Sequence, residues 1–200
     1  MVTIRNETHG DIDAREALLD RVWGAARFEK TAERLREGRT PAAGLALVAE
    51  ENDRDVVGQN LVGQSLVGTV RLWHVCAGPA RPALLLGPLA VEAAQRGCGV
   101  GAALMQRALA TARRRGHRAV ILVGDPEYYD RFGFSAEKTG SLWLPGPFER
   151  HRLLGCELEA GALDGARGLI GATGRPVPAP SLDALIANLA GGATVARRAA

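Results

Sequence analysis

The sequence is poor in the residues on which several classes of protein depend. It has 3 cysteines in 200 residues and no CxxC pair, which argues against a disulfide framework or a zinc site and favours a reducing compartment. No apolar run approaches the roughly 20 residues of a membrane-spanning helix, and the first residues lack the apolar stretch of a signal peptide. We therefore expect a cytoplasmic protein with no membrane segment and no metal site.

Aromatic residues are scarce as well, at 4% of the chain, and only Lys30 and Lys138 are lysines. The net charge is a modest +3, from 25 basic and 22 acidic residues. The densest basic run, Arg113-Arg114-Arg115, precedes Gly116, so we interpret it as the end of a helix, where cations complement the helix dipole. Without interleaved aromatic residues it does not predict a nucleic-acid groove.

The hydrophobic pattern predicts one α/β domain with an extension. Helices come first, then a run of strands, then a strand–helix–strand unit, an order that indicates a mixed sheet flanked by helices. We expect residues 1–160 to form the domain and residues 161–200 to form a Gly/Ala/Pro-rich extension with a short helix at 181–190. The expected elements are a helix from Asp11 or Asp13, a helical stretch at 29–37, a polar turn with some strand at 51–64, a helix at 99–115, and strands at 44–50, 65–75, 83–91, 119–123, 141–144 and 152–158.

A glycine-rich loop, Arg96-Gly97-Cys98-Gly99-Val100-Gly101-Ala102, lies between the strand at 83–91 and the helix at 99–115. Residues without side chains let backbone N–H groups converge on a ligand, and the helix N-terminus adds unpaired donors and the positive end of its dipole. The loop therefore predicts an anion site suited to a pyrophosphate. A turn that merely packs closely is the less favoured interpretation.

The same loop also satisfies the dinucleotide pattern GxGxxA through Gly97, Gly99 and Ala102. In that motif the first glycine follows its strand directly, whereas residues 92–96 intervene here, and the acidic residue expected about 20 positions later is missing. Only one strand–helix–strand unit is visible, and no lysine follows the glycines as in a Walker loop. A nucleotide-binding oxidoreductase domain is therefore a disfavoured alternative.

Three motifs in order resemble the GCN5-related N-acetyltransferase (GNAT) superfamily: the strand LGPLAV, the signature Arg96-x-x-Gly99-x-Gly101, and YYDRFGF one strand later. The fuller spelling GPLAV…RGxGVG…GHRAVILVGDPEYYxRFGF is similar to the small bacterial YhbS-like branch. The resemblance covers about residues 1–160 and is most specific over 87–134. It implies a mixed, mostly antiparallel sheet that splays into a V around acetyl-CoA as co-substrate.

The resemblance also implies direct transfer of the acetyl group to a primary amine in a ternary complex. The acceptor is a small molecule or a protein amino group, and we expect no nucleic-acid or membrane partner. A homodimer is one expectation for the assembly. A non-catalytic acyl-CoA-binding or regulatory module is the alternative, against which a retained tyrosine, Tyr129, argues mildly.

Individual roles follow from the resemblance and from residue chemistry. Proline cannot donate to a ladder, so Gly87-Pro88 predicts a bulge or bend in its strand. The resemblance implies that the backbone at Leu89, Ala90 and Val91 meets the pantetheine, with the Val91 N–H on the thioester carbonyl. Tyr129 matches the tyrosine that protonates the departing sulfur, and a phenol with a pKa near ~10 carries its proton at neutral pH.

Several assignments stay open at this point. Asp125 is counted with the residues that contact the cofactor, and Arg131 reaches a phosphate or faces water. Four residues are candidates for the general base, unless a chain of waters takes the proton: Glu50, Glu51, His74 and Asp125. Three aromatic residues are expected to fill the core beside Tyr129: Tyr128, Phe132 and Phe134. The acceptor is expected between the first helices, residues 71–74 and residues 143–150.

Overall fold

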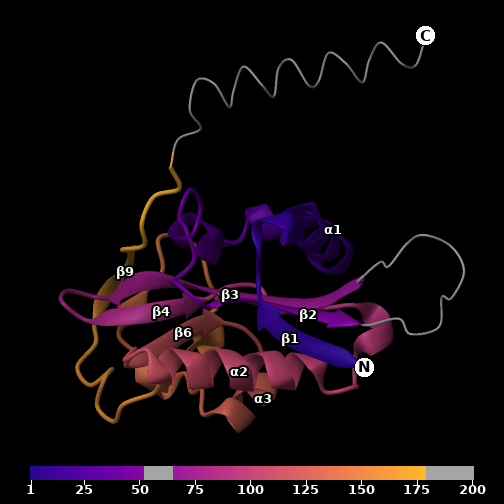
Figure 1. Ribbon diagram of the computed structural model, residues 1–200. Helices are drawn as coiled ribbons and strands as arrows, with labels where there is room; N and C mark the ends of the chain where they lie inside the picture. Colours follow the sequence, from indigo (N-terminus) through magenta and orange to yellow (C-terminus); the bar gives the residue numbers. More distant parts are fainter. Residues whose placement is uncertain (52–64, 179–200) are drawn as a thin grey trace, which may run out of the picture.

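The strands of the protein form one open sheet in the order β1-β2-β3-β4-β6-β8, with β5 and β9 also paired to β3 and β7 paired to β9 (Figure 1). This architecture comes from a computed structural model, which describes residues 1–51 and 65–178. The pairs β4–β6 and β7–β9 are parallel, and the other strand pairs are antiparallel. The predicted fold class, a mixed and mostly antiparallel sheet flanked by helices, is confirmed.

The elements follow the sequence pattern closely. The stretch at 29–37 forms a 3-10 helix at Thr31–Leu35 instead of an α-helix, and another 3-10 helix precedes it at Ala25–Phe28. None of the described helices is long and apolar enough to cross a membrane. The strands are β1 (Val2–Asn6), β2 (Ala46–Glu51), β3 (Ser65–Ala77), β4 (Pro82–Leu86), β5 (Ala90–Val91), β6 (Ala119–Val123), β7 (Leu142–Trp143), β8 (Leu153–Glu157) and β9 (Gly168–Ala172), and the α-helices are α1 (Ile12–Trp23), α2 (Val100–Arg114) and α3 (Pro126–Tyr129).

Two strands were not predicted. β1 is short and polar on one face, and it forms because its backbone pairs with β2 at the edge of the sheet while Val2 and Ile4 pack against the core. β9 pairs with β3 through Val75–Ala172 to Ala77–Ile170, so the sheet continues past residue 160, where the sequence analysis ended the domain. The expected helix at 181–190 and the turn at 52–64 lie outside the described residues.

β4 and β6 are apolar throughout because both faces of the sheet are covered there. In β4, Leu84 and Leu86 join the core cluster beneath α2, whereas Ala83 and Leu85 join a second cluster on the opposite face. α1 covers that opposite face further along, where Leu18 and Leu19 pack on Ala90 of β5. Figure 1 shows α1 and α2 on the two sides of the sheet. A strand that is buried on both faces has apolar residues on both, so its sequence does not alternate between apolar and polar. Strands of parallel sheets show the same continuous apolar pattern.

The sheet opens between β5 and β6. The parallel ladder of β4 with β6 contains Leu84–Val120 and Leu85–Ile121, and it ends just before Gly87-Pro88. Beyond this interruption β5 resumes pairing with β3 alone. The predicted break in the strand is therefore confirmed, and it is the place where the two halves of the sheet part.

Candidate active site

A cleft of about 860 Å³ occupies the opening between β5 and β6. Its walls come from residues 86–91 at the strand break, 95–102 before and within α2, and 123–131 around α3. Residues from 22–36 and from 144–152 close its other end. Small-molecule sites fall in the range of roughly 300–1,000 Å³, so this cleft has the size of a cofactor site.

The glycine loop presents unpaired backbone donors to the cleft. Gly97 and Gly99 have φ values of 80° and 83°, a left-handed conformation that glycine adopts without strain. Gly99 caps α2, and its carbonyl accepts the first intrahelical hydrogen bond from the Ala103 amide at 2.9 Å. The amides of residues 100–102 therefore have no helical partner, and they lie at the positive end of a 15-residue helix. This is an anion-binding arrangement.

The second source of backbone groups is the open edge of β5. The Glu92 amide donates to the Val67 carbonyl at 2.8 Å, and Ala90 is likewise directed at β3 by the register. Since alternate residues of an antiparallel strand point to opposite edges, the amides and carbonyls of Leu89 and Val91 face the cleft. No described strand pairs with that edge.

Tyr129 lies at the end of α3 and lines the cleft. Its ring packs edge-on against Tyr128 and Phe134, with centroids 4.9 and 5.9 Å apart. A Cβ at Gly124 would come within 2.3 Å of this ring, so the absence of a side chain there makes room for the phenol. Burial raises the pKa of Tyr129 to about 12, and the neighbouring Tyr128 adds to the shift. The phenol therefore keeps its proton at neutral pH.

Most of the residues predicted to contact the cofactor line this cleft. Ala90 does not, because its side chain is fully buried beneath α1 and its backbone faces β3. Cys98, an exposed residue of the loop, does not line the cleft either. Those that do are Leu89, Val91, Arg96, Gly97, Gly99, Val100, Gly101, Ala102, Asp125 and Tyr129.

The candidates for the general base are mostly elsewhere. Glu50 is buried and paired with an arginine of β1 at 2.8 Å, and Glu51 accepts a hydrogen bond from a glutamine side chain. His74 faces His117, with ring centroids 5.3 Å apart. Among the four, only Asp125 lines the cleft, and its carboxylate accepts from the amide two residues on at 3.1 Å, which caps α3.

Tyr128 is a correction to the sequence analysis. Phe134 is buried as predicted and Phe132 packs against the same core, but Tyr128 lines the cleft. Its hydroxyl lies 2.9 Å from the position of a Cβ at Gly101, and the Arg131 guanidinium stacks over its ring at 4.2 Å. Arg131 thus belongs to the cleft wall.

The cleft is strongly cationic. Six basic side chains line it against two carboxylates, a formal excess of four positive charges: Arg27, Lys30, Arg36, Arg96, Arg131 and Arg152, against Asp125 and Glu149. Burial lowers the pKa of Lys30, and the charges of Arg36 and Arg152 lower it further. Most of these cations come from segments outside the motifs at 87–134, so no local sequence pattern identifies them. The net positive charge of the cleft suits a polyanionic ligand.

Residues 3–136 match the family model described as an acetyltransferase (GNAT) domain. The chain belongs to the GNAT family. Among curated relatives, YhbS of Escherichia coli (strain K12), called an uncharacterized N-acetyltransferase, is 34% identical over 90 residues, which are 42% of this chain and 51% of YhbS. The chain thus spans about half the length of the curated relatives it matches.

Solved GNAT structures share the fold over most of the chain. The crystal structure of E. coli YhbS in complex with CoA has a TM-score of 0.68 and 28% sequence identity, and covers 86% of this chain and 89% of that one. A GNAT acetyltransferase from Brucella melitensis in complex with acetyl-CoA has a TM-score of 0.51 and 28% identity, with 77% and 94% covered. The resemblance drawn from the three motifs is confirmed.

Proposed function

We propose that this GNAT protein is an acetyl-CoA-dependent N-acetyltransferase that acylates a primary amine by direct attack within a ternary complex. The observation that carries the proposal is one cleft that is lined by the start of α2 with its unpaired amides, by the open edge of β5 and by Tyr129. The CoA and acetyl-CoA held by the two related structures support it. The low cysteine content still predicts a cytoplasmic location, and a homodimer remains an expectation.

The backbone supplies most of the binding groups. The diphosphate lies on the N-terminus of α2, and Arg96 and Arg131 are among the cations of the cleft wall. The pantetheine pairs with the open edge of β5 at Leu89 and Val91, as an added strand would. The Val91 amide then donates to the thioester oxygen, where negative charge develops as the amine attacks.

The reaction forms a C–N bond and breaks the C–S bond of the thioester. The amine must be neutral to attack, and its proton leaves through water in the cleft, since the one candidate base that lines the cleft caps α3. The sulfur takes a proton from the Tyr129 phenol, whose pKa of about 12 keeps the proton in place until the thiolate forms. The products are an acetamide and CoA. No described group of His, Cys, Asp and Glu side chains could hold a metal ion.

The first experiment is a thermal unfolding series with acetyl-CoA, NAD or ATP. At 100 times its Kd, a ligand that binds only the native state adds about 2.7 kcal/mol, or roughly 5–11 °C for a chain of this size. A side chain at Gly101 projects toward Tyr128, Val91 and Leu89, so Gly101→Glu should abolish the shift. Ala103→Glu places the same charge in the same turn at an exposed position outside the cleft, and should retain the shift.

The outcomes separate the candidate functions. A shift with acetyl-CoA that Gly101→Glu alone abolishes supports the cofactor assignment, and a screen of amines for CoA release then tests catalysis. Binding of acetyl-CoA with no turnover of any amine supports the acyl-CoA-binding module. No shift with acetyl-CoA, or a larger shift with NAD, overturns the transferase.

A further inference from the structure

A second cavity of about 310 Å³ adjoins the cleft at the strand break. Arg27, Arg36 and Pro88 line both spaces, so they meet where the strand is interrupted. The far walls come from α1, the turn at Thr31–Leu35 and β3. The volume is at the lower end of the range for small-molecule pockets. A ligand here lies next to Pro88 and outside the glycine loop, which lines the cleft alone.

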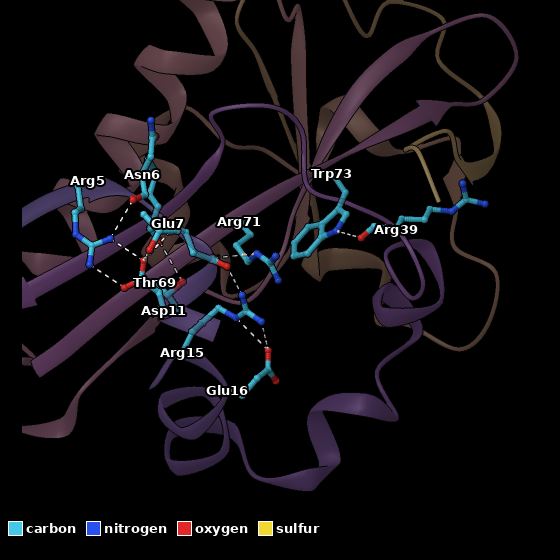
Figure 2. Close-up of polar contacts among 12 residues, drawn as sticks. Arg5, Asn6, Glu7, Asp11, Arg15, Glu16, Arg39, Thr69, Arg71 and Trp73 are labelled. Carbon is cyan, nitrogen blue, oxygen red and sulfur yellow. Dashed lines mark hydrogen bonds and ion pairs between the residues drawn. The ribbon is translucent and has the colours of Figure 1, made fainter. Parts of the chain in front are cut away.

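Four arginines line this cavity, Arg27, Arg36, Arg39 and Arg71, and Arg15 binds Glu16 of its wall. Arg15 is paired with Glu7 and with Glu16, the latter at 2.6 Å (Figure 2). Arg27 is paired with Glu16 and, at 3.0 Å, with Asp20. Each of these two guanidinium groups is thus paired with two carboxylates.

Arg36 and Arg71 are each paired with a single carboxylate. The Arg36 side chain is 6% exposed, and its Nε and Nη2 both bind Glu33. Its Nη1 has no hydrogen-bond partner among the described residues and lies 2.8 Å from the position of a Cβ at Gly87, at the strand break. Arg71 contacts Glu7 through Nε at 3.2 Å, and neither of its terminal nitrogens has a hydrogen-bond partner in residues 1–51 and 65–178.

Trp73 holds these two guanidinium groups on one indole. Their central carbons lie 5.5 Å (Arg36) and 5.4 Å (Arg71) from its ring centroid. The indole is itself fixed, because it is buried and its Nε1 donates to the Arg39 carbonyl at 3.1 Å (Figure 2). The cavity thus has a rigid wall that carries two cations.

A ligand carboxylate is the group that this wall lacks. Desolvation lowers the pKa of both Arg36 and Arg71, because the nearby carboxylates compensate only part of the cost of burying their charges. The planar guanidinium fork matches the two oxygens of a carboxylate, and such charge-assisted pairs are among the strongest hydrogen bonds in proteins. A carboxylate would fill the open donors and neutralise the excess charge.

We propose that the second cavity binds the acceptor through a carboxylate held by Arg36 and Arg71, so that the acceptor is a small amine with a carboxylate, of the size of a free amino acid. The proposal rests on the proposed function, since it presents the amine to the thioester through the opening at Pro88, where the second cavity meets the cleft. The amino group of such a ligand points past Pro88 into the cleft.

The test compares amino acids with their α-carboxamides, which keep the amine and remove the negative charge. Calorimetric titration into the CoA-bound protein should show at least one amino acid that binds about tenfold or more tighter than its amide. With that acceptor and acetyl-CoA, Arg71→Gln should raise KM about ten- to hundredfold while the Kd of acetyl-CoA stays unchanged. Arg71→Lys keeps the charge without the fork and should give an intermediate KM.

Arg34→Gln is the matched control. Arg34 lines neither cavity, and its Nη1 donates to the Pro145 carbonyl at 2.8 Å, so its loss should leave the preference for the acid intact. The binding comparison on the unmutated protein stands even if a variant does not fold. Amides that bind as tightly as the acids, or no binding of any amino acid, overturn the proposal. If acetyl-CoA still stabilises the protein in that case, the proposed function survives and only the acceptor assignment fails.

Discussion

Replacement of Tyr129 by phenylalanine isolates one titrating group of the cleft. The chain has 2 tyrosines, so the variant retains one. Burial raises the pKa of Tyr129 from 10.0 to about 12, and two pKa units correspond to about 2.7 kcal/mol in favour of the protonated phenol. In an alkaline titration, the tyrosinate absorbance of the wild type minus that of Tyr129→Phe reports Tyr129 alone. This difference should have its midpoint at a pH near 12.

The same shift has a consequence for stability. The pKa of Tyr129 is higher in the folded protein than in the unfolded chain, so the phenol loses its proton at a higher pH when the protein is folded. The contribution of Tyr129 to the free energy of unfolding is fully present below about pH 10 and is lost as the pH rises toward 12. By about pH 11 the wild type should lose roughly 1.4 kcal/mol more than Tyr129→Phe, measured by urea unfolding. A titration midpoint at or below that of a free phenol would refute the burial argument.

The functional consequence is tested on the same pair of proteins. If the phenol protonates the departing sulfur, Tyr129→Phe should lower kcat by about 10²- to 10⁴-fold and leave the thermal shift with acetyl-CoA intact. Loss of the thermal shift as well would mean that Tyr129 holds the cofactor instead. An unchanged kcat would exclude the proton-donor role.

Three further predictions concern other parts of the molecule. The Arg5 guanidinium holds the pKa of Asp11 well below its usual range, so Asp11→Asn should cost roughly 1–3 kcal/mol in urea at neutral pH; this difference should shrink as the pH falls below about 4, and a constant difference would contradict it. Gly99→Ala meets no atom within 4 Å but forces alanine to φ +83°, so it should cost about 1–2 kcal/mol in urea, and an unchanged midpoint would refute the strain. Burial and two arginines lower the pKa of Lys30, whereas Glu157 raises that of Lys138. Acetic anhydride at neutral pH should therefore modify Lys30 before Lys138, as followed by mass spectrometry, and equal modification of the two lysines would disprove this.

The local features of the site could be predicted because each depends on residues adjacent in the chain. The positive φ angles at 97 and 99 require glycine, and the break in the strand requires a residue that cannot donate, Pro88. The order and bounds of most helices and strands follow from periodicity, which is also a local property. The family could be identified from the same short segments.

What the sequence by itself determined is therefore the glycine loop, the interrupted strand and the tyrosine that follows, all within residues 87–134. Only the tertiary structure decided that β1 and β9 join the sheet, that Ala90 turns away from the cleft, and that Arg36 and Arg71 meet on one indole. These contacts join residues distant in the chain, so no periodicity or motif encodes them. They exist because packing brings the segments together, and the chemistry of the acceptor side depends on that packing.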